Sequence, residues 1–401
     1  MWKKWCHLYI TLAMTIVAVI AVPAAFPAYG AGPGQTDEII PDGVTEDQWV
    51  KLNDQTVEFD ELSDLVRYFN PDVQNITQSI SNSISDFQYI LDETRGYIRD
   101  LEDDAEELED SGATASVEGL VQYNMLNMTV KSLKTSANSM GRTLNYMNRT
   151  NSNVTQAVKT YTYYANQLMI SYSSTQSGLS SLQKLVEADT AALDSEKISY
   201  GLGTVTQSEV LSAQKKLIAA QSSLLSMENT VDSLLRSLCL MTGYSADSEL
   251  CIGAIPQVDM GELSSMDLEA DTEKAVRNNY LLISERHTAS NQTTTGINSK
   301  KASISESEQT IAVTMQSNFQ DVQQAKTAYE AASTAYEMAK MEWSKAERSY
   351  QHGLTSKNVY LQSQVDFLQA ESEIKSAYNN LYQAYDTYQW AVNGIIMTSI
   401  Q

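Results

Sequence analysis

Few residues in this sequence are of the types and spacing that covalent or metal chemistry needs. Its three histidines, His7, His287 and His352, lie far apart and have no partners at metal-ligand spacing. No glycine-rich phosphate loop is present, and no nucleophile is seen with a histidine partner. The sequence therefore predicts no catalytic residue, no metal ligand and no cofactor, and hence a protein that is not an enzyme.

The cysteines are the other reactive side chains. Cys239 and Cys251 lie twelve residues apart on either side of a turn at Gly243, whereas Cys6 lies in the N-terminal leader described next. In an oxidising compartment a Cys239–Cys251 disulfide would constrain the unfolded chain by ~2–3 kcal/mol. A bridge is expected, and two free buried thiols are the alternative.

Residues 1–30 have the pattern of a secretory signal peptide. Lys3 and Lys4 are followed by an apolar core over residues 10–21 and by the small-x-small sequence Ala28-Tyr29-Gly30. An uncleaved membrane anchor is the alternative. No later stretch reaches the ~18 apolar residues of a membrane-spanning helix. We therefore expect export to the cell envelope.

Composition restricts both the partner and the fold. Fifty acidic residues against 27 basic ones give a net charge of −23, which excludes a nucleic-acid-binding surface. All six prolines lie at or before residue 71 or at residue 256, and only 17 glycines are present. Sheet-rich folds need many turns built from these residues. The sequence thus predicts an all-α fold of long helices.

The chain contains an internal repeat. Ser199-Tyr200-Gly201-Leu202-Gly203 aligns with Ser349-Tyr350-Gln351-His352-Gly353 at an offset of 150 residues. We expect a flexible lead-in over residues 31–56, a first helical repeat over 57–255 and a second over 256–401.

Heptad patterns run through both repeats. Apolar residues recur every seven positions at Val210, Leu217, Leu224, Val231 and Leu238, and at Tyr360, Phe367, Ile374, Leu381 and Tyr388. A second set interleaves with them, as in antiparallel coiled coils: Ala213, Ala220, Met227 and Leu234 in the first repeat, and Ser363, Ala370, Ala377, Ala384 and Ala391 in the second. A second apolar line follows Leu211, Ile218 and Leu225 in the first repeat, and Leu361 and Leu368 in the second. A helix with two apolar lines packs on two neighbours, so we expect self-assembly.

Two glycine-containing breaks separate an incoming long helix from an outgoing one, which predicts helical hairpins. Glycine permits the positive φ that ends the first helix, and Thr206 or Ser208 can cap the next. The candidate partner-binding residues are those of the two tips: Tyr200, Gly201, Gly203, Thr204 and Thr206 in the first, and Tyr350, Gly353, Thr355 and Ser356 in the second.

The first tip, followed by Ala213-Gln214 and by Leu238-x-x-Met241-Thr242-Gly243, resembles the TolC-like outer-membrane efflux family. The second copy, from Tyr350-x-x-Gly353 to Gly394, is similar to that family's second repeat. The segments Asn70-Pro71 and Asn278-Asn279 look like the starts of the two repeats.

The resemblance implies a homotrimer whose hairpins form a hollow cylinder. It also implies docking of the tips to a periplasmic membrane-fusion adaptor, which links the cylinder to an ABC- or proton-driven inner-membrane pump. The expected function is therefore an exported conduit for efflux or secretion. The alternative is a coiled-coil scaffold of the cell envelope without channel activity.

The sequence departs from that family where each family repeat carries a β-hairpin for a membrane barrel. The gap over residues 110–116 is too short for two spanning strands, and residues 291–301 are polar on both faces. We expect tight helix–helix turns at both places. Eight acids over residues 100–110 precede the first turn. We interpret them as a solvated end, with a cation-binding rim as the alternative.

Overall fold

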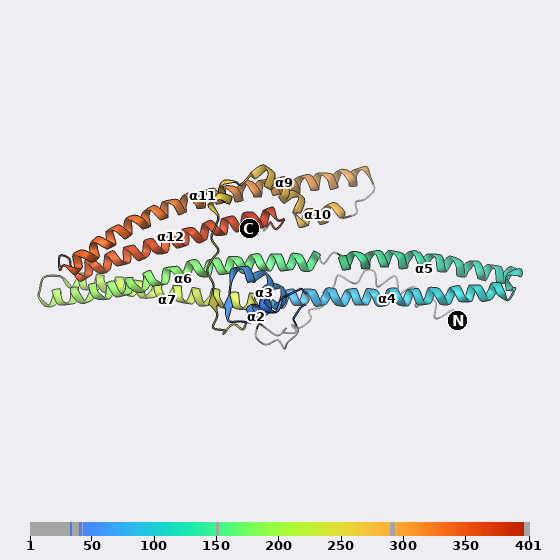
Figure 1. The fold of residues 1–401 in the computed structure, drawn as a ribbon, viewed down its shortest axis with the longest axis horizontal. Helices are drawn as coiled ribbons and strands as arrows, with labels where there is room; N and C mark the ends of the chain where they lie inside the picture. The colour runs from blue at the N-terminus through green and yellow to red at the C-terminus, as the bar shows by residue number, and fades with distance from the viewer. Residues whose placement is uncertain (1–32, 34–39, 42, 150–151, 289–292, 397–401) are drawn as a thin grey trace.

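The computed structural model describes residues 33, 40–41, 43–149, 152–288 and 293–396. The expected signal peptide, residues 1–30, lies outside the described residues. Long antiparallel helices make up most of the rest, which confirms the all-α fold. In Figure 1 one helical hairpin (orange and red) lies along one side of a longer four-helix layer (blue to yellow-green).

The first repeat consists of two long helical hairpins that extend in opposite directions from a central core. Its elements are α2 (Glu46–Leu52), β1 (Thr56–Val57), η1 (Phe59–Glu61), α3 (Leu62–Phe69), α4 (Pro71–Asp110), η2 (Ala113–Ala115), α5 (Val117–Arg149), α6 (Ser152–Gly201) and α7 (Gln207–Met241). The α4–α5 hairpin points one way and the α6–α7 hairpin the other (Figure 1).

The second repeat is a single long hairpin with a small base. Its elements are β2 (Cys251–Ile252), α8 (Met260–Ser264), α9 (Leu268–Asn278), α10 (Tyr280–His287), α11 (Thr294–Gln351) and α12 (Lys357–Val392). Strand β2 pairs in parallel with β1, with Thr56 opposite Cys251. The α11–α12 tip lies at the same end of the molecule as the α6–α7 tip (Figure 1).

The expected flexible lead-in over residues 31–56 is wrong for its second half. Residues 46–52 form α2, whose Thr45 N-cap is part of a capping box with Gln48. Leu52 and Val57 are buried in the first core, and Trp49 stacks on Phe69. A helix of two turns and a strand of two residues are too short to show a period, so the pattern was not visible in the sequence.

The predicted heptad lines form the contacts within each hairpin. On α7, Val231 and Leu238 are buried, and on α12 so are Leu381 and Tyr388. In the second hairpin the contact is an aromatic ladder, since Trp343 of α11 lies 5.0 Å from Tyr360 and 6.2 Å from Phe367 of α12, between ring centroids. Such aromatic pairs add to the free energy gained by burial alone.

The base of the first repeat is fastened by an asparagine and a glycine. The Asn70 side-chain oxygen accepts the amide hydrogens of Asp72 and Val73 at the start of α4. Its Nδ2 donates to the Met241 carbonyl oxygen at the end of α7, at 2.8 Å. Gly243 follows with φ +83°, and it lies so close to the Phe69 backbone that a Cβ there would be 2.4 Å from the Phe69 carbonyl oxygen.

The base of the second repeat uses the same arrangement. The Asn279 side-chain oxygen accepts the amide of Leu282, and the Asn278 amide group donates to the Val392 carbonyl oxygen at 3.2 Å. Gly394 has φ +92° and lies against the Asn278 backbone. The repeat detected in the sequence is therefore a repeat of structure, with each hairpin tied to the start of its own repeat.

The turn after α4 is tight, as expected. Gly112, at φ +70°, and the short helix η2 join α4 to α5. In the second repeat, residues 294–301 belong to α11, and residues 289–292 lie outside the described part of the chain. Within the part of the chain that the structure describes, no helix is both long enough and apolar enough to cross a membrane.

Gly243→Ala should destabilise the protein more than Gly203→Ala. Both glycines have positive φ, +83° and +72°, so alanine meets a similar backbone strain of about 1–2 kcal/mol at each. Only at residue 243 would the new Cβ lie 2.4 Å from the Phe69 carbonyl oxygen, whereas at residue 203 nothing lies within 4 Å. Urea unfolding of both variants measures the difference. Equal losses would contradict the fastening role of Gly243.

Candidate functional site

The tip of the first hairpin is built by backbone hydrogen bonds and one carboxylate. Helix α6 ends where the amide of Gly203 donates to Tyr200 and that of Thr204 to Ser199, the pattern of a Schellman motif. Thr206 then caps α7, and the Glu209 carboxylate accepts from the Thr206 amide at 2.6 Å. These hydrogen bonds hold the pKa of Glu209 below its usual value. Thr206, and not Ser208, is therefore the N-cap.

The tip of the second hairpin repeats this backbone. Gly353 donates to Tyr350 and Leu354 to Ser349, after which Ser356 caps α12 by accepting from the Val359 amide. Tyr350 stacks on Tyr360 with ring centroids 4.4 Å apart. Of the tip residues chosen from the sequence, Gly201, Gly203, Thr204 and Thr206 are exposed, as are Tyr200, Tyr350 and Gly353, and Thr355 is half-buried.

The sequence analysis missed two tip residues. Leu202 is 75% exposed and Leu354 is 78% exposed, more than the tyrosines beside them. An apolar side chain held open in a turn stabilises nothing within the chain. Each tip therefore has one exposed leucine, and a leucine among glycines and hydroxyl residues was the signal that could have found them.

The expected bridge between Cys239 and Cys251 is corrected by the structure, in which both cysteines are free. Cys239 faces the first core from α7, where burial raises the pKa of its thiol. Cys251 is exposed on β2, where its amide donates to the Gln55 carbonyl oxygen at 2.9 Å. The chain between them ends α7 and crosses to pair with β1, so one thiol faces inward and the other outward.

The lateral face of the second hairpin is covered by the first. Leu361 and Val365 of α12 pack against Ala188 of α6, and Leu361 is only 4% exposed. Farther from the tips the same contact is polar. Ser174 and Ser376 hydroxyls lie 3.0 Å apart, and the Asn379 amide group donates to Ser173. The second apolar line on α12 thus has its neighbour within the chain.

The equivalent faces on α7 and α11 have no such cover. Leu211 matches Leu361 at the offset of 150, and Ile218 matches Leu368; Leu211 and Ile218 are each 57% exposed. On α11, Met338 matches the buried Ala188, and both Met338 and Met341 are exposed. The lateral contact between α6 and α12 is therefore buried within the chain. The matching faces, on α11 and on α7, are both exposed.

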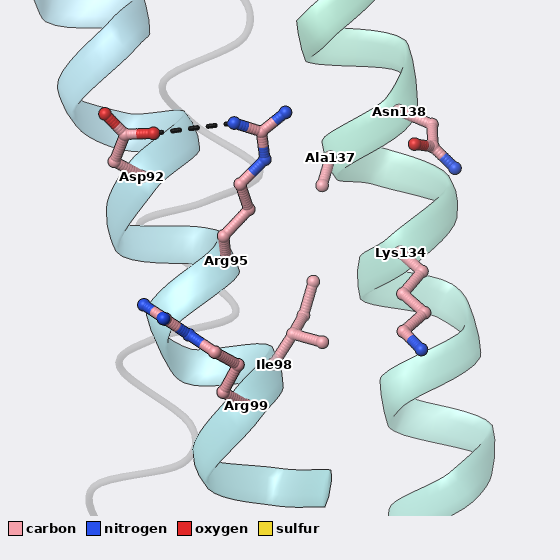
Figure 2. A pocket seen from close by; sticks show the side chains of 7 residues that line it. All are labelled: Asp92, Arg95, Ile98, Arg99, Lys134, Ala137 and Asn138. Carbon is pink, nitrogen blue, oxygen red and sulfur yellow. Dashed lines mark ion pairs between the residues drawn. The ribbon is translucent and has the colours of Figure 1, made fainter.

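A shallow groove of about 600 Å³ opens between α4 and α5 (Figure 2). It is lined by Asp92, Arg95, Ile98, Arg99, Lys134, Ala137 and Asn138. Arg95 pairs with Asp92 at 3.6 Å, and Lys134 pairs with Glu102. These pairs are exposed, so they add little stability. Among the described residues, no three His, Cys, Asp or Glu side chains are grouped as metal ligands would be.

Comparison with known proteins gives a fold-level likeness. No protein-family model and no curated protein matches the chain. Among solved structures, the Campylobacter jejuni CmeC outer membrane channel aligns at 11% identity over 93% of each chain, with a TM-score of 0.44. The outer-membrane channel OprN aligns at 11% identity over 93% of this chain and 98% of its own, with a TM-score of 0.46.

The outer membrane protein VceC of Vibrio cholerae aligns at 12% identity over 65% of this chain and 76% of its own, with a TM-score of 0.42. The chain resembles these proteins. Scores this low do not decide a function, which has to be inferred from the molecule's own surfaces.

The contact between α6 and α12 also contains a titratable group. Asp386 is half-buried there, and desolvation raises its pKa to about 6, although hydrogen bonds from Asn166 and Trp390 act in the other direction. Because the folded-state pKa lies above the ordinary value of 3.8, the carboxylate lowers stability. That cost is absent below about pH 4 and complete above about pH 6.

Asp386→Asn should therefore gain stability relative to the wild type as pH rises from 4.5 to 7.5, by on the order of 2 kcal/mol. The asparagine stays uncharged and can still accept a hydrogen bond. Urea unfolding at both pH values gives the difference, with Asp366→Asn on the exposed face of α12 as the control. The account is wrong if the Asp386 difference is the same at both pH values.

Proposed function

We propose that this chain is the exported conduit component of an efflux or secretion system in the cell envelope. In this proposal three copies form a hollow cylinder of helical hairpins, and the hairpin tips bind a membrane-fusion adaptor. The adaptor in turn contacts an ABC- or proton-driven pump. The observation that carries the proposal is the pair of open lateral faces, on α7 and on α11.

A ring follows from these faces by symmetry. Within the chain, the outgoing helix α12 packs on the incoming helix α6. The same contact between α7 of one copy and α11 of the next would bury Leu211 and Ile218 against Met338 and Met341. Because the two surfaces differ, the contact is heterologous, and heterologous contacts close into rings when the rotation permits. The copy number of three is taken from the resemblance to TolC-like conduits.

The dimensions suit a tube. Helix α11 has 58 residues, or about 87 Å at 1.5 Å per residue. In a closed ring each long helix contacts a neighbour on both sides, as the two apolar lines of α7 require. Six hairpins around an axis leave a passage along it, and such a passage needs no catalytic group.

The tips are the proposed adaptor-binding site. Both tips lie at one end of the molecule (Figure 1), and both present an exposed leucine above a Schellman turn. In a ring of three copies, six similar tips would form a circle. The last carbonyl groups of α6 and α11 are partly free there and can pair with the helix ends of a partner.

A photo-cross-linking amino acid in place of Leu202 or Leu354 should capture the adaptor in living cells. The same amino acid in place of Tyr89, which is 68% exposed about midway along α4, should not. Mass spectrometry of the captured bands identifies the partner. If both tip positions yield only products between copies of this chain, the conduit proposal fails and an envelope scaffold without channel activity is favoured.

A further inference from the structure

The α4–α5 hairpin extends beyond the second repeat. At the offset of 150, the start of α11 at Thr294 corresponds to residue 144, so residues 117–143 of α5 have no counterpart. In Figure 1 this end of the hairpin projects alone, away from the two tips. Neither the tips nor the lateral faces explain what the projection does.

The projection has an apolar face that is exposed to solvent among the residues that the structure describes. Four residues of α5 form it, and we call them the distal stripe: Val117, Val121, Met125 and Met128. Their exposed fractions lie between 54% and 83%. Their spacing of four, four and three residues puts them on one helix face.

The distal stripe turns away from α4. The opposite face of α5 packs on α4 through Leu126, Val130 and Leu133. The stripe is therefore not part of the hairpin's own core. Four large apolar side chains gathered on an exposed helix face are typical of an interaction surface.

The charge around the distal stripe is mainly negative. Residues 100–130 contain nine acids and neither lysine nor arginine. The Tyr123 hydroxyl donates to the Glu109 carboxylate at 3.1 Å, which puts the acidic end of α4 level with the stripe. Basic side chains follow at the inner end of the stripe, with Lys131 three residues after Met128 and with Arg95, Arg99 and Lys134 around the groove of Figure 2.

The negative charge near the distal stripe distinguishes among the partners that could bind there. A second copy in the same orientation would bring another nine acids against this end, and like charges would oppose the contact. An anionic lipid surface would be repelled in the same way. A partner with apolar residues on one face and basic residues beside them would complement both the apolar stripe and the acids near it.

We propose that the distal stripe binds a basic amphipathic helix of a partner protein. The stripe spans twelve residues, about 16 Å from the first to the last, which suits about three turns of a helix with anchors at i, i+3 or i+4 and i+7. Met125 and Met128 are flexible and polarisable, so they can adapt to different apolar anchors. The acids of α4 attract the basic residues over about a Debye length of 8–10 Å.

The probe is a fluorescent 18-residue peptide of leucine and lysine with helical periodicity, titrated into the mature full-length protein. A peptide of the same composition with scrambled order is the control for charge alone. We expect the ordered peptide to bind at least ten-fold more tightly than the scrambled one. Equal affinities would overturn the proposal, because the protein would then act only as a polyanion.

Protein variants test the location. Met125→Ser/Met128→Ser should weaken binding of the ordered peptide at least ten-fold, and Asp103→Asn/Glu106→Gln/Glu107→Gln should weaken it several-fold. The matched control Tyr89→Ser/Leu281→Ser removes two exposed apolar side chains elsewhere and should leave the affinity unchanged. Equal affinity in the Met125/Met128 variant and the wild type would refute the site.

Two other occupants are excluded by measurements on the same variants. Sedimentation equilibrium should show the same oligomer for the Met125/Met128 variant and the wild type. A smaller oligomer would assign the distal stripe to contacts between copies. Flotation with phosphatidylcholine vesicles should show no stripe-dependent binding, and such binding would assign the stripe to lipid. Either result would overturn the proposal.

Discussion

Helices α7, α11 and α12 each carry more apolar surface than their antiparallel hairpin partner covers, and the arrangement of the hairpins depends on this. The heptad lines within each hairpin use one face of every helix. The lateral lines then need a second neighbour. Between α6 and α12 the chain supplies that neighbour, with Leu361 and Val365 against Ala188. At α7 and α11 it does not, and the proposed ring assigns these two faces to contacts between copies.

The bases and the tips of the hairpins both contain glycines with positive φ that follow a helix, but the surroundings of these glycines differ. At the bases, Gly243 and Gly394 each lie within contact distance of a neighbouring backbone, next to an asparagine cap. At the tips, Gly203 and Gly353 have the same positive φ, but nothing lies within 4 Å of the place of a Cβ. The bases are closed by the chain itself, whereas the glycines of the tips face open space.

Most of the fold could be predicted from the sequence because long helices that pack side by side have a regular seven-residue spacing of apolar residues. On α7 and on α12, an apolar residue recurs at five successive positions spaced seven residues apart. The glycine breaks then fix where the hairpins turn. The lines of Leu211 and Leu361 were both seen in the sequence, but which of them is covered within the chain depends on how the two hairpins lie against each other. Sequence period alone does not contain that information.

The remaining differences have local causes. Helix α2 and strand β1 are too short to have a visible period, and the orientation of Cys251 depends on the pairing of β2 with β1. Leu202 and Leu354 were passed over because the glycines and hydroxyl residues around them matched a turn. Asp386 resembled any other acid of an acidic chain, and only its burial beside Asn166 distinguishes it.

Cross-linking between copies tests the central claim most directly. Leu211→Cys and Met338→Cys are combined in a chain without its native cysteines and treated with a short bismaleimide. Ala188→Cys with Leu361→Cys provides the matched pair within one chain, because these residues make the same contact internally. The account predicts a ladder of covalent species up to three chains for the first pair and a single chain for the second. A single chain for both pairs, with the internal pair fully linked, would contradict it.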